Sequence, residues 1–179
     1  MKSLSAFLFV PVLFVILIFA GCNQQDNNPV EGNSNSGNDN SFLAKHYNLP
    51  PATMAELQQA KIATARYNNI GNAIADGYAD INVIVPHMGY HYMKSSYVDA
   101  KFEIDKPEIL VYSHNPIAGN MRLVAVEYAI PNTEPEPEGF TGSYDVWDNN
   151  STFGLWLLHA WVWEYNPDGV FTDLNPNVP

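Results

Sequence analysis

The stretch RLVAVEYAI, residues 122–130, decides the fold class, because it is rich in β-branched and apolar residues and, read as a β-strand, is apolar on both faces. One face carries Val124, Val126, Tyr128 and Ile130, and the other carries Leu123, Ala125, Glu127 and Ala129. Within residues 123–130 Glu127 is the only Asp, Glu, Lys, Arg or His, and a buried carboxylate is costly unless it is paired, protonated or bound to a cation. Two interpretations follow: Glu127 lies at a sheet edge and faces water, or it has a functional or buried-pair role.

Further strands are expected on both sides of this stretch. They are residues 81–85, which end at Pro86, residues 108–112, and the aromatic residues 155–164, which end at the turn NPDG of residues 166–169. The pairs Asn115-Pro116 and Gly119-Asn120 separate residues 108–112 from residues 122–130 with the spacing of a hairpin. Residues 132–139, NTEPEPEG, are expected to form an acidic, proline-rich loop.

Upstream of these strands the hydrophobic period becomes that of a helix. Apolar residues recur at steps of three and four, namely Leu57, Ala60, Ala63, Tyr67, Ile70, Ile74 and Tyr78. Thr53 and Glu56 have the spacing of a capping box, and Gly77 is a plausible helix stop. The sequence therefore predicts one long amphipathic helix over residues 53–76. With about four to six antiparallel strands after it, the expected fold is α+β, with the helix packed on a curved sheet or partial barrel.

The N-terminus has the features of a targeting segment. Lys2 precedes the apolar residues 4–19, and Ala20-Gly21-Cys22 follows. This pattern resembles the lipobox of bacterial lipoproteins, although Phe19 stands where leucine is usual. The resemblance implies a signal peptide over residues 1–21 and lipid modification of Cys22. The alternative is an uncleaved transmembrane anchor, since the apolar run could nearly span a bilayer. In both cases the domain is expected outside the cytoplasm.

Residues 23–41 are almost purely Asn, Ser, Gly, Gln and Asp, a composition typical of a flexible tether between the lipidated Cys22 and a single globular domain over residues 42–179. Cys22 is the only cysteine, so its acylation leaves no thiol for a disulfide, a zinc-thiolate site or a nucleophile. The net charge of −11 argues against a basic surface that would bind nucleic acid or anionic lipid. Membrane contact is therefore expected through the lipid. Because Asn23 is not Asp, the outer membrane is favoured in a double-membraned bacterium.

Histidines supply the candidate site. His87 and His91 flank Met88-Gly89 in the stretch VPHMGYHY, residues 85–92. In a straight strand, residues four apart lie about 13 Å apart, whereas a sharp turn at Gly89 would let both imidazoles converge. His159 lies in the aromatic strand, either as a core histidine bonded to a backbone carbonyl or as a ligand in an aromatic-walled pocket.

Together His87, His91, Glu127 and His159 form a suitable ligand set for a divalent transition metal such as Zn, Cu or Fe, because three neutral imidazoles and one carboxylate match the donors that these ions prefer. We therefore expect an extracytoplasmic lipoprotein with a small ligand- or metal-binding site, which leaves open whether it is an enzyme. The alternative is a non-enzymatic structural or interaction lipoprotein that uses its aromatic strand as a binding or oligomer surface.

Four short motifs follow one another between Pro86 and Trp163. They are P-x-M-G-x-H-[YW] at residues 86–92, PEILVY at residues 107–112, L-x-x-V-E-Y-x-x-P at residues 123–131 and L-H-A-W at residues 158–161. This set resembles a group of secreted or lipid-anchored bacterial domains. The group brings no known reaction with it, but the resemblance implies that the M-G-x-H turn, Glu127 and His159 belong to one site.

Overall fold

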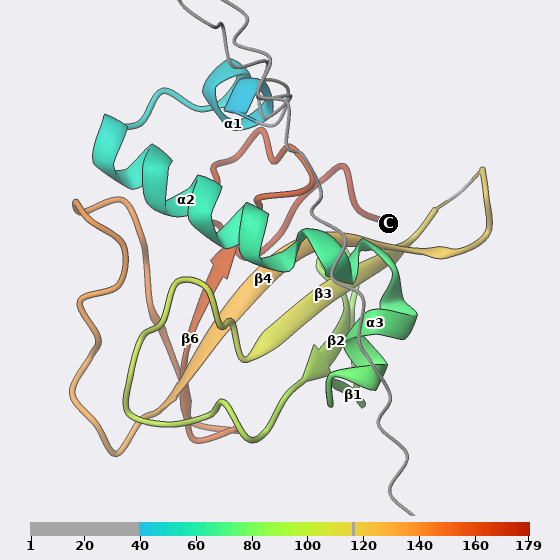
Figure 1. Ribbon diagram of the computed structural model, residues 1–179. Coiled ribbons are helices and arrows are strands. Elements are labelled where there is room, and N and C mark those ends of the chain that lie inside the picture. The colour runs from blue at the N-terminus through green and yellow to red at the C-terminus, as the bar shows by residue number, and fades with distance from the viewer. Residues whose placement is uncertain (1–39, 116) are drawn as a thin grey trace, which may run out of the picture. The chain divides into compact units, whose positions relative to one another are not determined.

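A computed structural model describes residues 40–115 and 117–179 (Figure 1). The elements follow in the order α1 (Asn40–His46), α2 (Pro51–Thr64), the 3-10 helix η1 (Ala65–Asn68), α3 (Ile70–Ala75), β1 (Ala79–Val85), β2 (Gly89–Met93), β3 (Ile109–His114), β4 (Met121–Pro131), β5 (Asp148–Asn150) and β6 (Leu155–Ala160). The predicted signal peptide, Cys22 and most of the tether lie outside the described residues. Asn40 and Ser41, which were expected in the tether, begin α1.

The predicted α+β class is confirmed. The strands form one six-stranded antiparallel sheet in the order β1-β2-β3-β4-β6-β5, and the sheet curls into a half-barrel. Helices α2 and α3 run across one face of this sheet (Figure 1). Strand β5 was not predicted from the sequence, because it has only 3 residues and is composed of Asp and Asn. Among the described residues, no helix combines the length and the apolar character that crossing a membrane requires.

The prediction of one long helix over residues 53–76 is wrong. The 14-residue α2 passes into η1, and a new helix, α3, begins after Asn69. Asn69 has extended backbone angles, and its side chain accepts a hydrogen bond from the Gly71 amide, which is the geometry of an N-cap. The hydrophobic period continues through this break because Tyr67 and Tyr78 remain in the core, so periodicity alone did not reveal it.

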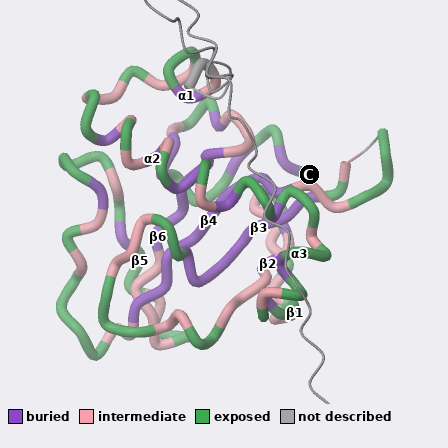
Figure 2. The backbone as a smooth tube through the Cα atoms, viewed as in Figure 1, coloured by how far each residue is buried: buried purple, intermediate pink, exposed green. Residues whose placement is uncertain are grey.

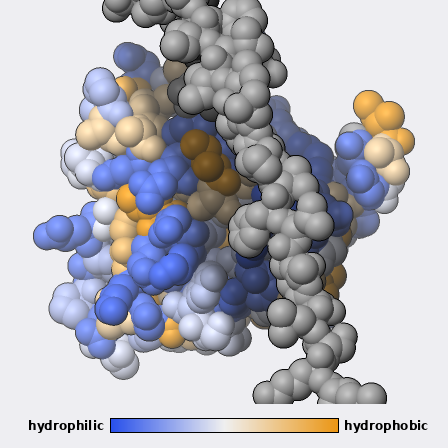
Figure 3. Space-filling model, in the orientation of Figure 1, coloured by the Kyte–Doolittle hydropathy of each residue, from blue (hydrophilic) through white to orange (hydrophobic). Residues whose placement is uncertain are grey.

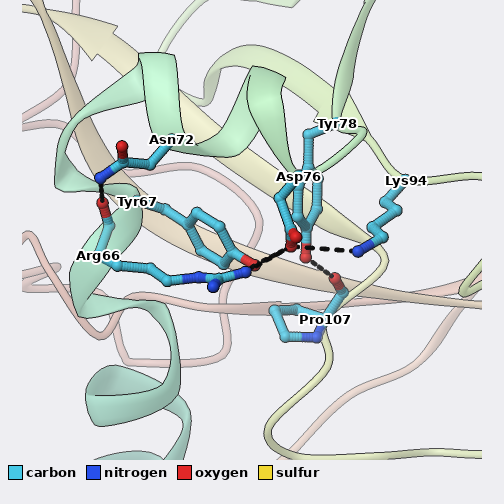
Figure 4. Close-up of polar contacts among 7 residues, drawn as sticks. All are labelled: Arg66, Tyr67, Asn72, Asp76, Tyr78, Lys94 and Pro107. Carbon is cyan, nitrogen blue, oxygen red and sulfur yellow. Dashed lines mark hydrogen bonds and ion pairs between the residues drawn. The ribbon is translucent and has the colours of Figure 1, made fainter.

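A polar cluster holds the two sides of the break together (Figure 4). The Asp76 carboxylate, at the end of α3, accepts hydrogen bonds from the Tyr67 hydroxyl at 2.5 Å and from Lys94 at 3.1 Å, and it pairs with Arg66 at 2.6 Å. These donors hold the pKa of Asp76 well below its usual range, at about 2. Because Tyr67 and Arg66 belong to η1, the cluster fixes the angle between η1 and α3.

The predicted capping box is also wrong. Pro50 precedes α2 and Pro51 is its first residue, a position where the missing N–H of proline has no cost. Thr53 instead donates to the Thr141 carbonyl at 2.6 Å, and the Glu56 carboxylate accepts from the Thr141 amide and hydroxyl at 2.6 and 2.5 Å. The two polar residues therefore attach α2 to the long connection between β4 and β5.

Strand β4 lies in the middle of the sheet and is buried on both faces (Figure 2). On the helix-covered face, Tyr112 of β3 donates its hydroxyl hydrogen bond to the Tyr67 carbonyl of η1. Glu127 projects from the opposite, concave face, and it is only 4% exposed. The interpretation of Glu127 as an edge residue facing water is therefore excluded.

The aromatic strand ends earlier than its sequence suggests. β6 stops at Ala160, whereas residues 161–164 bend away from the ladder. The register of β4 against β3 shifts at Val124, and the Val124 carbonyl accepts from the amides of both Trp163 and Glu164. This bulge ends the regular pairing of β4 with β6, and the chain turns so that the Trp161 amide bonds to Val170.

Candidate metal centre

Two of the predicted ligands are direct neighbours in the sheet. Glu127 of β4 pairs with His159 of β6 in the antiparallel register, so their side chains project from the same face. His91 of β2 pairs with Val111 of β3, and Ile109, two residues away on β3, pairs with Glu127. Because side chains alternate along a strand, His91 also projects from this concave face.

The three side chains lie close enough to hold a metal ion. One ligand atom of each of His91, Glu127 and His159 lies within 4.8 Å of the others. The Nε2 atom of His159 is 3.4 Å from Glu127 Oε1, and the Nε2 atom of His91 is 3.7 Å from Glu127 Oε2. These distances exceed those of a good hydrogen bond. They are close to the roughly 3.3–3.6 Å that separates ligands bound tetrahedrally at about 2.0–2.2 Å from one ion.

A bulge in β1 orients the His91 ring. Asp80 pairs with Tyr92 and Ile84 with Tyr90, so three residues of β1 stand opposite His91. Asn82 in this bulge has a positive φ of 56°, and the neighbouring Val83 carbonyl accepts a hydrogen bond from His91 Nδ1 at 3.0 Å. A carbonyl oxygen only accepts, so Nδ1 carries the proton. The Nε2 atom of the neutral ring then presents a lone pair toward Glu127.

His159 is the least satisfied polar side chain of the site. Its ring stacks on Trp161 with centroids 5.6 Å apart, and the side chain is 2% exposed. Within the described part of the chain, neither ring nitrogen has a hydrogen-bond partner. The expected core histidine bonded to a backbone carbonyl is therefore not observed. A buried polar nitrogen without a partner costs about 1–3 kcal/mol, so a ligand that supplies a partner would stabilise it.

Burial and neighbouring charges set the protonation of the other two residues. Burial raises the pKa of Glu127, whereas the facing His159 and His91 lower it, and the net shift is downward. Burial lowers the pKa of His91 more than the Glu127 carboxylate raises it. At neutral pH an ionised carboxylate and a neutral imidazole thus face each other with lone pairs on both, and a cation between them would remove the repulsion.

The structure does not bring His87 to this cluster, which corrects the expectation that His87 and His91 converge. Val85 pairs with Gly89, so a tight turn does occur, but it leaves His87 exposed at its tip with a φ of 64°. His87 Nδ1 donates to the Val178 carbonyl at 2.9 Å, and the His87 backbone bonds to Pro179 and Asn175. His87 therefore fastens the C-terminal segment to the β1–β2 turn.

A cavity of about 150 Å³ adjoins the three ligands on the concave face. Its walls are mostly apolar, and they include Val83, Val85, Ile109, Phe153 and Leu157. The other polar residues that line it are Asp148, Asn150 and Asp173. Because Asp173 lies in the irregular C-terminal segment, no periodic signal in the sequence pointed to it.

Comparisons with protein-family models, with curated proteins and with solved structures find no match to this chain. Within residues 40–115 and 117–179, one group of three or more His, Cys, Asp or Glu side chains has ligand atoms close enough to share an ion, and it consists of His91, Glu127 and His159.

Proposed function

We propose that this protein binds a divalent transition metal ion through His91, Glu127 and His159. The observation that carries the proposal is His159, which is buried beside an ionised carboxylate and has no hydrogen-bond partner among the described residues for either ring nitrogen. A bound cation would satisfy one of these nitrogens and neutralise Glu127 at the same time.

The donor set restricts the metal class. Two imidazole nitrogens and one carboxylate suit Zn²⁺, Fe²⁺ or Cu²⁺, whereas Ca²⁺ and Mg²⁺ prefer sites made of oxygen ligands. His87, which would have been a fourth protein ligand, bonds to the C-terminal segment instead. The site therefore offers three protein ligands and leaves at least one coordination position free.

A metal ion held by His91, Glu127 and His159 would lie beside the cavity, since all three residues line it. A cavity of about 150 Å³ has the volume of a pocket that holds benzene, so it admits water or a small molecule. A metal with an open position polarises a bound carbonyl or lowers the pKa of a bound water. The proposal includes binding of a small ligand there, and it does not require catalysis.

We further propose that the protein is an extracytoplasmic lipoprotein held to its membrane by an acylated Cys22. Support comes from the apolar run of residues 4–19 followed by Ala20-Gly21-Cys22 and from the absence of any other cysteine in the sequence. A location outside the cytoplasm would expose the site to metal ions of the surroundings without competition from cytoplasmic thiols.

The alternative, an interaction surface on the aromatic strand, has less support. The indole N–H groups of Trp156, Trp161 and Trp163 donate to Glu134, Thr172 and Thr64, so these rings are bonded within the domain. The apolar tip visible in Figure 3 belongs to the β3–β4 turn, where Ile117 is 97% exposed, and not to the aromatic strand.

Metal titration of the full-length chain in detergent tests the proposal. The chelator-stripped protein should bind one Zn²⁺, Fe²⁺ or Cu²⁺ per chain, measured by elemental analysis after equilibrium dialysis. His91→Ala and His159→Ala should each weaken binding by at least about 100-fold, since each removes one of three ligands. Glu127→Gln should weaken it similarly if Glu127 is a ligand, and should leave it largely intact if Glu127 acts only as a base.

His87→Ala and His114→Ala are the matched controls, because both replace an exposed histidine outside the cluster. Both variants should bind metal like the wild type, and circular dichroism should show that all variants are folded. Wild-type binding well below one ion per chain, or unchanged affinity in folded His159→Ala, would overturn the proposal.

A further inference from the structure

The cavity connects the buried ligands with polar residues at the surface. His91, Glu127 and His159 are 3%, 4% and 2% exposed, whereas Asp148 and Asp173, which line the same cavity, are exposed. A cation that reaches the buried ligands through this cavity therefore passes these two carboxylates.

The sheet directs Asp148 toward the cavity. Asp148 of β5 pairs with Leu157 of β6, and His159 lies two residues further along β6. Since residues 157 and 159 project from one face of the strand, Asp148 and His159 lie on the same face of the sheet. Asn150, which pairs with Leu155, projects from this face too, and its side-chain amide donates to Asp148 Oδ2 at 3.4 Å.

The C-terminal segment positions Asp173 from the other side. The Trp161 indole donates to the Thr172 carbonyl, and the side-chain amide of Asn166 donates to the Leu174 carbonyl, so both neighbours of Asp173 are held. In this position Asp173 lines the same cavity as Asp148, Glu127 and His159.

We propose that Asp148 and Asp173 form an outer subsite that captures a hydrated divalent cation at the mouth of the cavity and transfers it to His91, Glu127 and His159. This inference rests on the proposed function. His159, which also carries the proposed function, indicates where the cation would be bound: it is buried, it lines the same cavity as the two carboxylates, and it has no hydrogen-bond partner within the described residues.

Electrostatics explains why such a subsite is needed. Outside its polar residues the cavity is lined by side chains such as Val83, Val85 and Ile109, which offer nothing to replace the water that a cation loses. Carboxylates at the mouth raise the local cation concentration and accept the ion while it still holds water. Such focusing accelerates association by roughly 10–1,000-fold at low ionic strength, and salt screens it.

Zinc uptake by the chelator-stripped full chain tests the subsite. Stopped-flow mixing with Zn²⁺ and a fluorescent zinc indicator gives the association rate constant, and equilibrium competition with the indicator gives Kd. For the double variant Asp148→Asn with Asp173→Asn, the association rate constant should fall by about tenfold at low ionic strength, and its salt dependence should flatten. The Kd should change by a smaller factor, because release through the same mouth slows as well.

A matched control removes the same number of negative charges at positions outside the cavity. Glu134 and Glu136 are exposed in the β4–β5 connection and do not line the cavity, so Glu134→Gln with Glu136→Gln should keep the wild-type rate. An equal slowing in this control, or a wild-type rate in the Asp148/Asp173 variant, would overturn the proposed subsite. Neither result would contradict metal binding by His91, Glu127 and His159. A wild-type chain that binds none of Zn²⁺, Fe²⁺ and Cu²⁺ at equilibrium would overturn both proposals.

Discussion

Gly89 satisfies two constraints at the beginning of β2. Its φ is +121°, and a Cβ atom added there would lie 2.3 Å from the Tyr112 carbonyl oxygen of β3. That contact is with backbone, so it is relieved only if β2 moves away from β3. His91 lies two residues further along β2, and any such movement would displace its ring from Glu127.

Gly89→Ala should therefore lower both stability and metal affinity. We expect the free energy of unfolding to fall by more than about 2 kcal/mol, because strain at a positive φ adds to the backbone clash. Gly119→Ala is the control: its φ is +69°, but nothing lies within 4 Å of an added Cβ. Chemical denaturation and zinc titration of both variants check this, and equal effects would show that the approach to Tyr112 is unimportant.

Glu108 is a second buried carboxyl group, and its environment differs from that of Glu127. It is 2% exposed, and its Oε2 accepts a hydrogen bond from the Ala129 amide at 2.9 Å. Burial raises the pKa of Glu108 to about 8, although the Ala129 hydrogen bond opposes the shift. In the folded protein Glu108 therefore stays protonated at neutral pH, whereas in the unfolded chain it ionises near its ordinary pKa of 4.5.

This difference makes stability depend on pH. Between about pH 4.5 and 8 the folded state holds a proton that the unfolded state has lost, so the contribution of Glu108 to stability decreases as pH rises, by up to about 1.4 kcal/mol per unit. Glu108→Gln keeps an acceptor for Ala129 without a titrating group, so its advantage over wild type should grow from pH 5 to pH 8. Urea denaturation across this range, with exposed Glu134→Gln as control, would contradict the assignment if the difference stays constant.

At the scale of elements, α2 is held to the β4–β5 connection by side chains that have the spacing of a helix cap. Glu56 accepts two hydrogen bonds from Thr141, 85 positions away in the sequence. Glu56→Ala should therefore destabilise the protein by about 1–2 kcal/mol, because a charged acceptor is lost.

Amide exchange should show where this loss acts. In Glu56→Ala we expect faster exchange in residues 139–147 and little change at the beginning of α2, where Pro50 and Pro51 set the helix start. Gln59→Ala, at an exposed position of the same helix, should leave both regions unchanged. Faster exchange confined to residues 51–56 would instead indicate a capping role for Glu56.

Hydrophobic patterns in the sequence predicted some of the helices and strands and missed others. The nearly continuous apolar run in residues 122–130 predicted a strand inside β4 correctly, because a strand that is buried on both faces is apolar at almost every position. The period of residues 57–78 predicted helical structure but not the break at Asn69. Tyr67 before the break and Tyr78 after it are both buried, so the period continues across the break although Ile74 is exposed. β5 has no apolar period at all, and its pairing with β6 defines it.

At the scale of the whole molecule, membrane attachment is predicted to depend on Cys22, which lies outside the described residues. Cys22→Ser should abolish acylation, so the protein should be released or remain unprocessed in its native host. Fractionation and mass spectrometry of the N-terminus check this. Ser34→Ala, in the predicted tether, is the control. Normal processing and membrane retention of Cys22→Ser would contradict the lipoprotein assignment.

Some features of the candidate site follow from the local sequence, and others follow from how distant strands pair. The sequence by itself determined the α+β class, the strand that carries Glu127 and the candidacy of Glu127 and His159, because periodicity and the cost of burying a charge are local properties. The tertiary structure alone decided that Glu127 pairs with His159 across β4 and β6 and that His91 joins them, while His87 binds the C-terminal segment. The physical reason is strand register: it is set by pairing between distant segments and by bulges, and a shift of one residue moves a side chain to the opposite face of the sheet.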